Sequence, residues 1–243
     1  MSQIVIYGGL TGFALVFGAM IGIIFRMSQR MIARFMAFGS GVLICALTFG
    51  LMEEAFNHGG FDAVIIGFLA GGLAFIGGDY ILHRSGGRHH KHKPVFKIKG
   101  SANGAAITLG AILDGLPESI ALGIALFAGQ GKGLLMLVAI VLSNFPEGIA
   151  SITGLKKEGF SNKKIILIWL AVGMAVALVS IGSFVFLHNL NLNTIGILES
   201  FAAGAILAML ADTMMPEAYE DGGFSIGILT VLGFLVAFII SRF

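Results

Sequence analysis

Long apolar stretches constrain this sequence more than any other feature. Eight of them reach about 20 residues, the length a helix needs to cross the hydrocarbon core of a membrane. Strands of a membrane barrel would alternate apolar and polar residues, and these stretches do not, so we predict helices. The predicted spans are residues 4–25, 33–56, 61–82, 102–127, 132–155, 164–187, 195–218 and 222–241.

The composition excludes an ordinary soluble enzyme. Hydrophobic residues make up 57% of the 243 residues and charged residues 12%, whereas a soluble domain has about 25% charged residues. One cysteine, Cys45, excludes an internal disulfide and a thiolate cluster. Because the connections between spans are short, we predict a single transmembrane domain over residues 1–243, with one sizeable loop at 83–101.

The positions of the basic residues predict the orientation in the membrane. If the N-terminus lies outside, 13 of the 15 Lys and Arg residues fall on the inner side. Only Lys132 and Arg242 then remain outside, as the positive-inside rule requires. We therefore expect both termini to be extracytoplasmic, in the plasma membrane or a bacterial inner membrane, with loop 83–101 in the cytoplasm.

Two internal similarities suggest an inverted repeat. Residues 38–56 match residues 201–219 at an offset of 163, with Gly41/Gly204 and Leu47/Leu210 among the identities. Residues 114–126 and 143–155 share a Pro-Glu pair, and the two segments of each match lie on spans of opposite direction. The simplest interpretation is a 3+2+3 inverted repeat, an arrangement typical of transporters with a site at the midplane.

Acidic residues lie near the middle of the fourth and fifth predicted spans. Asp114 and Glu118 share a helix face because they are four residues apart, and so do Ser143 and Glu147. An acid at this depth costs about 3 kcal/mol unless it has a partner or water. No Lys or Arg lies at the same depth, so we expect a bound cation to be that partner.

Each central glutamate follows a proline. Pro117 and Pro146 should free the carbonyl oxygens of Leu113 and Leu142, which then become candidate oxygen ligands. Further acids lie towards the two ends of the expected cation route. We expect Glu53, Glu54 and His58 at the outer mouth, and Asp212, Thr213 and Glu217 towards the inner end, although solvated helix ends would explain such residues equally well.

These residues resemble the ZIP (Zrt/Irt-like) family of metal transporters, in which the fourth span typically reads H-N-x-P-E-G and the fifth H-x-x-P-E-G. The corresponding segments here begin at Asp114 and Ser143. The resemblance implies eight spans, both termini outside and a metal centre built by spans four and five. It places Asp114, Glu118, Ser143 and Glu147 at a first metal site, and Gly115, Glu118, Asn144, Glu147 and Thr213 at a second.

Both histidines of the family pattern are replaced, by Asp114 and Ser143. Imidazole suits zinc, whereas carboxylates and water suit harder ions. The resemblance implies Zn²⁺ and the ligand set a weaker preference for it, so we expect uptake of divalent transition metals, with Zn²⁺ first and Fe²⁺, Mn²⁺ or Cd²⁺ as alternatives. A two-metal centre would have few ligands at its second site, because Gly115 has no side chain and Thr213 has no carboxylate. Asp212 is the candidate to provide the missing carboxylate.

The loop contains four histidines that are candidate metal ligands, although an ordinary positive-inside loop is the simpler interpretation. They are His83, His89, His90 and His92.

Two other functional classes match parts of this sequence. An intramembrane aspartyl hydrolase needs two central Asp residues, and only Asp114 is central here. A non-transporting metal sensor or structural relative remains the main alternative. We expect no enzyme activity, no cofactor apart from the metal substrate, and membrane lipid but no nucleic acid as a partner; the resemblance allows a homodimer. We also expect Trp169 in an interfacial aromatic belt.

Overall fold

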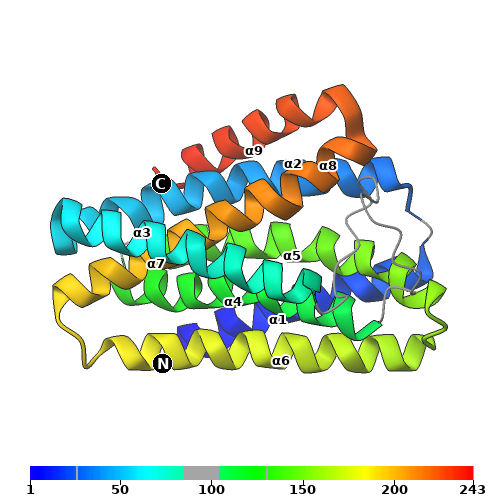
Figure 1. Cartoon of the computed structure of the whole chain (residues 1–243), viewed down its shortest axis with the longest axis horizontal. Coiled ribbons are helices and arrows are strands. Elements are labelled where there is room, and N and C mark those ends of the chain that lie inside the picture. Colours follow the sequence, from blue (N-terminus) through cyan, green and yellow to red (C-terminus); the bar gives the residue numbers. More distant parts are fainter. Residues whose placement is uncertain (26, 85–103, 130, 243) are drawn as a thin grey trace.

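The computed structural model describes residues 1–25, 27–84, 104–129 and 131–242, and these residues contain helices and no strands. The helices run roughly along one axis and form an elongated bundle (Figure 1). This agrees with the predicted all-α membrane fold. The α-helices are α1 (Ser2–Ile24), α2 (Gln29–Ala46), α3 (Glu53–Arg84), α4 (Gly104–Ala128), α5 (Lys132–Lys157), α6 (Asn162–Leu187), α7 (Leu192–Met209), α8 (Met215–Gly222) and α9 (Ile226–Ile240).

Six helical stretches of the described chain are long and apolar enough to cross a membrane. Two of them are far longer than one crossing requires: Gln29–Leu82 has 54 residues and Leu192–Ile240 has 49. Each turns back at a glycine with positive φ, Gly60 at 65° and Gly223 at 64°, a conformation that side chains with a Cβ rarely adopt. The chain is therefore polytopic, while eight crossings and the side of the termini stay predictions.

The two halves of the chain carry the same irregularities at matched positions. Short π-helical segments, η1 (Leu47–Met52) and η2 (Leu210–Met214), begin at residues that the offset of 163 pairs with each other. The same offset relates Gly60 to Gly223. Helices α2 and α7 run in opposite directions (Figure 1). Chance similarity between apolar sequences would not place backbone breaks in register, so these observations support the inverted repeat.

Helix packing also repeats between the two halves, because α2 packs on α9 and its counterpart α7 packs on α3. Both contacts depend on a glycine of the matched pair. A Cβ on Gly41 would collide with the carbonyl oxygen of Thr230, and a Cβ on Gly204 with that of Phe68. Such close backbone approach is the usual role of small residues between membrane helices.

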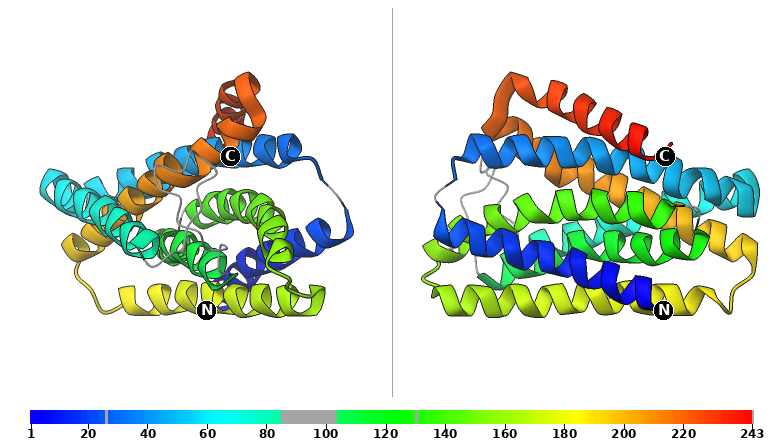
Figure 2. Two further views of the ribbon diagram at one scale, coloured as in Figure 1. Left: turned by 45° about the vertical axis from the view of Figure 1, so that its right-hand side comes forward. Right: turned by 180° about the vertical axis from the view of Figure 1, so that it is seen from behind.

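Helices α4 and α5 lie in the middle of the bundle, between α1 and α6 on one side and α2, α3 and α7 on the other (Figure 2). The position explains why their polar residues are buried. The prediction for Trp169 was wrong, since its side chain is 1% exposed and packs in a cluster with residues of α1 and α5 such as Leu15 and Leu155.

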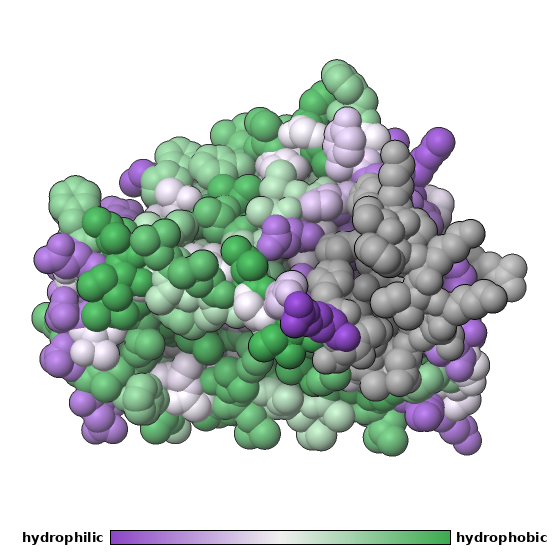
Figure 3. Space-filling model, in the orientation of Figure 1, coloured by the Kyte–Doolittle hydropathy of each residue, from purple (hydrophilic) through white to green (hydrophobic). Residues whose placement is uncertain are grey.

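The surface agrees with a membrane location. Apolar residues cover the middle of the face drawn in Figure 3, and polar residues gather at the two ends of the bundle. Large apolar side chains are exposed along α3 and α6, among them Leu69, Leu73, Leu167 and Leu178. Lipid is the natural partner of such a belt.

Candidate metal-transport site

A cavity of about 50 Å³ lies where α2, α4, α5, α7 and η2 meet α8. A single water occupies about 10–15 Å³ by this measure, so the cavity has room for a few waters or a partly hydrated ion. Among the described residues, four carboxylates, two hydroxyls and three thioethers line it, and none of these lining residues is basic. They are Met36, Asp114, Glu118, Ser143, Glu147, Met209, Thr213, Met214 and Glu217.

Six of the predicted site residues meet at this cavity. The four-residue spacing places Asp114 with Glu118 on one face of α4, and Ser143 with Glu147 on one face of α5. On the third side, η2 contributes Thr213 and α8 contributes Glu217. Helix periodicity alone explains the first two pairs, whereas their meeting with the seventh predicted span is a result of the tertiary fold.

Glu118 is the most deeply buried of these acids, with 2% of its surface exposed. Ser143 Oγ donates a 2.7 Å hydrogen bond to Glu118 Oε1. The other oxygen, Oε2, is buried without a hydrogen-bond partner among the described residues. A buried acceptor of this kind is costly unless something compensates it, and a cation in the cavity would do so.

Three predicted residues do not reach the cavity. Asp212 is exposed, so it does not compensate for Thr213. Asn144 is buried on another face of α5, where its Nδ2 donates to the backbone oxygen of Thr11 at 3.2 Å. Gly115 faces α6, since a Cβ there would lie 3.1 Å from Val176. Of the residues expected at a second metal site, Glu118, Glu147 and Thr213 therefore line the cavity, whereas Gly115 and Asn144 do not.

The freed carbonyls are also directed elsewhere. Both helices continue through Pro117 and Pro146, but neither Leu113 nor Leu142 lines the cavity. The Leu142 oxygen faces Gly39 of α2, where a Cβ would be 2.8 Å away. The ligands that the cavity offers therefore come from side chains.

The sequence interpretation missed three methionines, Met36, Met209 and Met214. Methionine is a common gap filler in apolar cores, so its presence in a membrane span gives little signal. The only local hint is that Met209 precedes Thr213 by four residues and so shares its face. Thioether sulfur is a soft ligand, which changes the chemistry available to the cavity.

The acids of the cavity lie close together but do not form a complete coordination sphere. Within the described residues, no group of three or more His, Cys, Asp or Glu side chains is arranged to hold a metal ion. An ion bound here would need water, Ser143 or a thioether as additional ligands, or a small closure of the helices. Such incomplete coordination suits an ion that must also leave.

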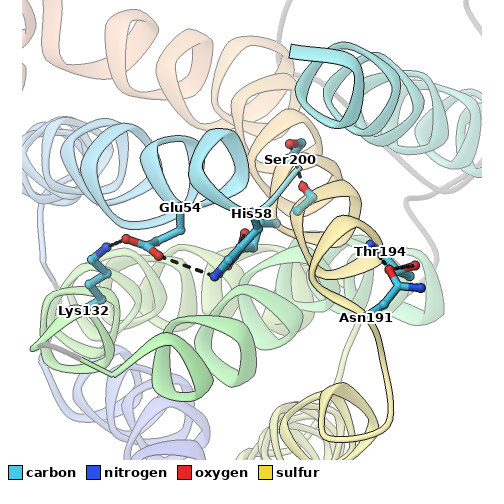
Figure 4. Close-up of polar contacts among 8 residues, drawn as sticks. Glu54, His58, Lys132, Asn191, Thr194 and Ser200 are labelled. Atoms are coloured by element: carbon cyan, nitrogen blue, oxygen red, sulfur yellow. Dashed lines mark hydrogen bonds and ion pairs between the residues drawn. The ribbon is translucent and has the colours of Figure 1, made fainter. Parts of the chain in front are cut away.

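A second polar cluster lies at the end of the bundle where α3 and α5 begin (Figure 4). His58 Nδ1 is 2.9 Å from Glu199 Oε2, and His58 Nε2 is 3.8 Å from Glu54 Oε2. Lys132 Nζ pairs with Glu54 Oε1. Glu199 is 1% exposed and was not predicted; an acid inside an apolar span was the signal for it.

The histidine-rich loop is almost entirely outside the described residues, and with it His89, His90 and His92. The backbone of His83 belongs to the last turn of α3. Metal binding by these four residues stays a prediction.

An acid-lined cavity between the helices of an apolar bundle defines a polytopic membrane protein with a candidate cation site. The family described as ZIP Zinc transporter matches residues 78–241, about two thirds of the chain. The chain belongs to the ZIP family, which is a family of transporters and not of enzymes.

One relative is an Arabidopsis thaliana protein named "Putative zinc transporter At3g08650". It is 27% identical over 186 residues, which are 75% of this chain and 29% of the relative. The chain therefore spans less than a third of that relative's length.

Proposed function

We propose that this protein carries divalent transition-metal cations across the membrane into the cytoplasm. The observation that carries the proposal is the central cavity, where Asp114, Glu118, Glu147 and Glu217 meet inside an apolar bundle and where no basic residue lines the part of the cavity that the structure describes. Carboxylates gathered at this depth repel one another and are costly to desolvate. A divalent cation relieves both effects. Membership of the ZIP family supports the same function.

The donor set favours borderline ions. Carboxylates accept Mn²⁺ and Fe²⁺ readily, while the thioethers of Met36, Met209 and Met214 add affinity for softer ions such as Zn²⁺ and Cd²⁺. Mg²⁺ and Ca²⁺ gain nothing from sulfur and prefer oxygen ligands only. We therefore expect Zn²⁺ to be transported, with Fe²⁺, Mn²⁺ and Cd²⁺ as competitors.

The proposed topology has eight crossings with both termini outside. Two long helical stretches that turn back at Gly60 and Gly223 support the number. Both ends of the chain lie towards the same end of the bundle (Figure 1), as an even number of crossings requires. The positive-inside rule gives the direction, and uptake into the cytoplasm follows from the family resemblance.

Apolar packing separates the cavity from the Glu54–His58 end of the bundle. Leu51, Leu135 and Ile206 are buried side chains on the helices that join the two regions. In this conformation we infer that an ion cannot pass between them. Transport would then require the repeat halves to shift, as in other inverted-repeat transporters.

The second candidate is a metal sensor or structural relative that no longer transports. The observation in its favour is that the described acids do not form a complete three-residue metal site. A sensor would bind metal without flux, so a transport measurement separates the two functions.

The test is uptake of Zn²⁺, Mn²⁺, Fe²⁺, Cd²⁺, Mg²⁺ and Ca²⁺ into proteoliposomes containing the purified protein. Glu118→Gln combined with Glu147→Gln should abolish uptake, because it removes both motif carboxylates. Glu158→Gln, in the connection after α5, is the matched control and should retain uptake. Absence of flux for all six ions, with insertion verified, would overturn the proposal in favour of the sensor.

A further inference from the structure

The Glu54–His58 end of the bundle holds a second arrangement of potential ligands, built on three different helices. His58 and Glu54 belong to the first turns of α3, Glu199 to α7 and Lys132 to the start of α5. Their side chains are 20%, 15%, 1% and 16% exposed, so all of them except Glu199 are accessible from the surface. Figure 4 shows Lys132, Glu54 and His58 in a row.

The histidine is oriented by its buried neighbour. An ionised Glu199 can only accept a hydrogen bond, so His58 Nδ1 carries the hydrogen of their 2.9 Å contact. In the neutral imidazole the lone pair then resides on Nε2, which faces Glu54 Oε2 at 3.8 Å. A carboxylate that fixes a histidine in this way is the usual outer partner of a metal-binding imidazole.

The space between His58 Nε2 and Glu54 Oε2 is close to that of two ligands on one metal. Bonds of 2.0–2.1 Å at a tetrahedral angle separate a nitrogen and an oxygen ligand by about 3.4 Å. The observed 3.8 Å is within a small side-chain rotation of that value. With only two protein ligands, an ion here would keep several waters and exchange quickly.

Lys132 already supplies a positive charge to this group. Its ammonium pairs with Oε1 of Glu54, the oxygen that does not face His58, and Glu53 and Glu199 also interact electrostatically with it. A metal bound by Glu54 would bring a second cation next to the ammonium. The two cations therefore compete for one carboxylate.

We propose that Glu54 and His58 form a capture site for a divalent transition-metal ion at the outer end of the bundle, oriented by Glu199, and that Lys132 is a tethered cation which the metal displaces. The site lies about 15 Å from the central cavity, the rise of the ten residues from Glu199 to Met209. Its role as a stage of uptake rests on the proposed function, whereas its ability to bind metal does not.

The test is titration of the purified protein with Co²⁺, whose visible absorption reports ligation by histidine and carboxylate. The background carries Glu118→Gln and Glu147→Gln, which disable the central cavity, together with His83→Ala, His89→Ala, His90→Ala and His92→Ala, so that the loop offers no imidazole. We expect His58→Ala to remove the absorption and Glu199→Gln to weaken binding by about 10- to 100-fold. Lys132→Gln should tighten binding by about two- to fivefold, the size of a solvent-accessible ion pair.

Two control variants isolate the charge at residue 132. Lys132→Arg keeps the competing cation and should bind Co²⁺ like the parent, and Lys157→Gln removes a lysine from the opposite end of α5. Should Lys132→Gln and Lys132→Arg give the same affinity, the displacement would be refuted. Co²⁺ absorption that survives both His58→Ala and His58→Gln, in variants with an unchanged size-exclusion profile, would refute the site.

Proteoliposome uptake separates this inference from the function on which it builds. If the unaltered protein transports Zn²⁺ and Lys132→Gln leaves the KM for uptake unchanged, the capture site fails as a stage of uptake and the proposed function stands. If the unaltered protein transports no ion but still binds Co²⁺ through His58, the proposed function fails and the capture site stands.

Discussion

Ser143 Oγ donates to Glu118 Oε1 at 2.7 Å and thereby joins α4 and α5 across the central cavity. Ser143 occupies the position that Asp114 occupies in the matched segment of α4, and Glu118 corresponds to Glu147. The two segments are therefore not used equivalently. On α4 both polar residues are acids, whereas on α5 one acid is replaced by a hydroxyl that holds an acid of the other helix.

Removing this hydroxyl should loosen the helix pair only modestly. Hydrogen bonds between membrane helices contribute about 0.6 kcal/mol on average and at most about 1.7 kcal/mol. We expect Ser143→Ala to lower the free energy of unfolding by an amount in this range, measured by reversible denaturation in detergent. Ser151→Ala is the control, because Ser151 bonds only to the backbone of its own helix at Gly148; equal losses for both variants would contradict the prediction.

Restoring the family histidines should change which ion is preferred. Asp114→His combined with Ser143→His replaces a carboxylate and a hydroxyl with imidazoles, which Zn²⁺ favours over Mn²⁺. We expect the ratio of Zn²⁺ to Mn²⁺ uptake in proteoliposomes to rise about tenfold, equivalent to about 1.4 kcal/mol. The single Asp114→His variant should produce part of the change, and an unaltered ratio in the double variant would show that these two positions do not select the ion.

The sequence predicted the parts of the site that depend on helix periodicity. Spacing by four residues was enough to pair Asp114 with Glu118 and Ser143 with Glu147 on their own helices. The offset between residues 38–56 and 201–219 also pointed to the matched halves. The aligned π-helical segments were not expected, because nothing in residues 47–52 or 210–214 distinguishes them from ordinary helix.

The residues that the sequence did not place correctly are those whose role depends on the direction in which the side chain points from its helix. Asp212 adjoins Thr213, yet one is exposed and the other lines the cavity, since neighbouring residues on a helix point about 100° apart. Trp169 was expected at the membrane interface and packs inside. Met36 gave no recognisable signal and Glu199 only that of an acid inside an apolar span, so the fold is needed to place them at the cavity and beside His58.

Asp212 and Glu217, the two acids at the proposed inner end, should differ strongly in their contribution to transport. Glu217 lines the cavity and Asp212 does not, so Glu217→Gln should reduce the kcat/KM for metal uptake by at least about tenfold, an effect of about 1.4 kcal/mol. Asp212→Asn makes the same chemical change on the exposed face and should leave uptake within twofold of the parent. A loss of activity in Asp212→Asn alone would indicate a route outside the cavity.

Close packing through Gly41 should make this position intolerant of even one methyl group. Its Cβ would collide with the backbone carbonyl of Thr230, which no rotamer change can move aside. Gly41→Ala should therefore destabilise the protein by about 1–3 kcal/mol, the usual cost of overpacking. Gly9→Ala is the matched control, since nothing lies within 4 Å of its Cβ position, and the thermal midpoints of the two variants in detergent provide the comparison.

The orientation in the membrane can be tested by cysteine labelling with little background. The native Cys45 is fully buried, so a membrane-impermeant maleimide should not reach it in intact cells. Ser2→Cys, at the start of α1, should react from outside, because the basic connections between helices belong to the cytoplasm under the positive-inside rule. Ser161→Cys, in the short connection between α5 and α6, should react only after the membrane is permeabilised. Labelling of Ser161→Cys but not Ser2→Cys in intact cells would reverse the proposed topology.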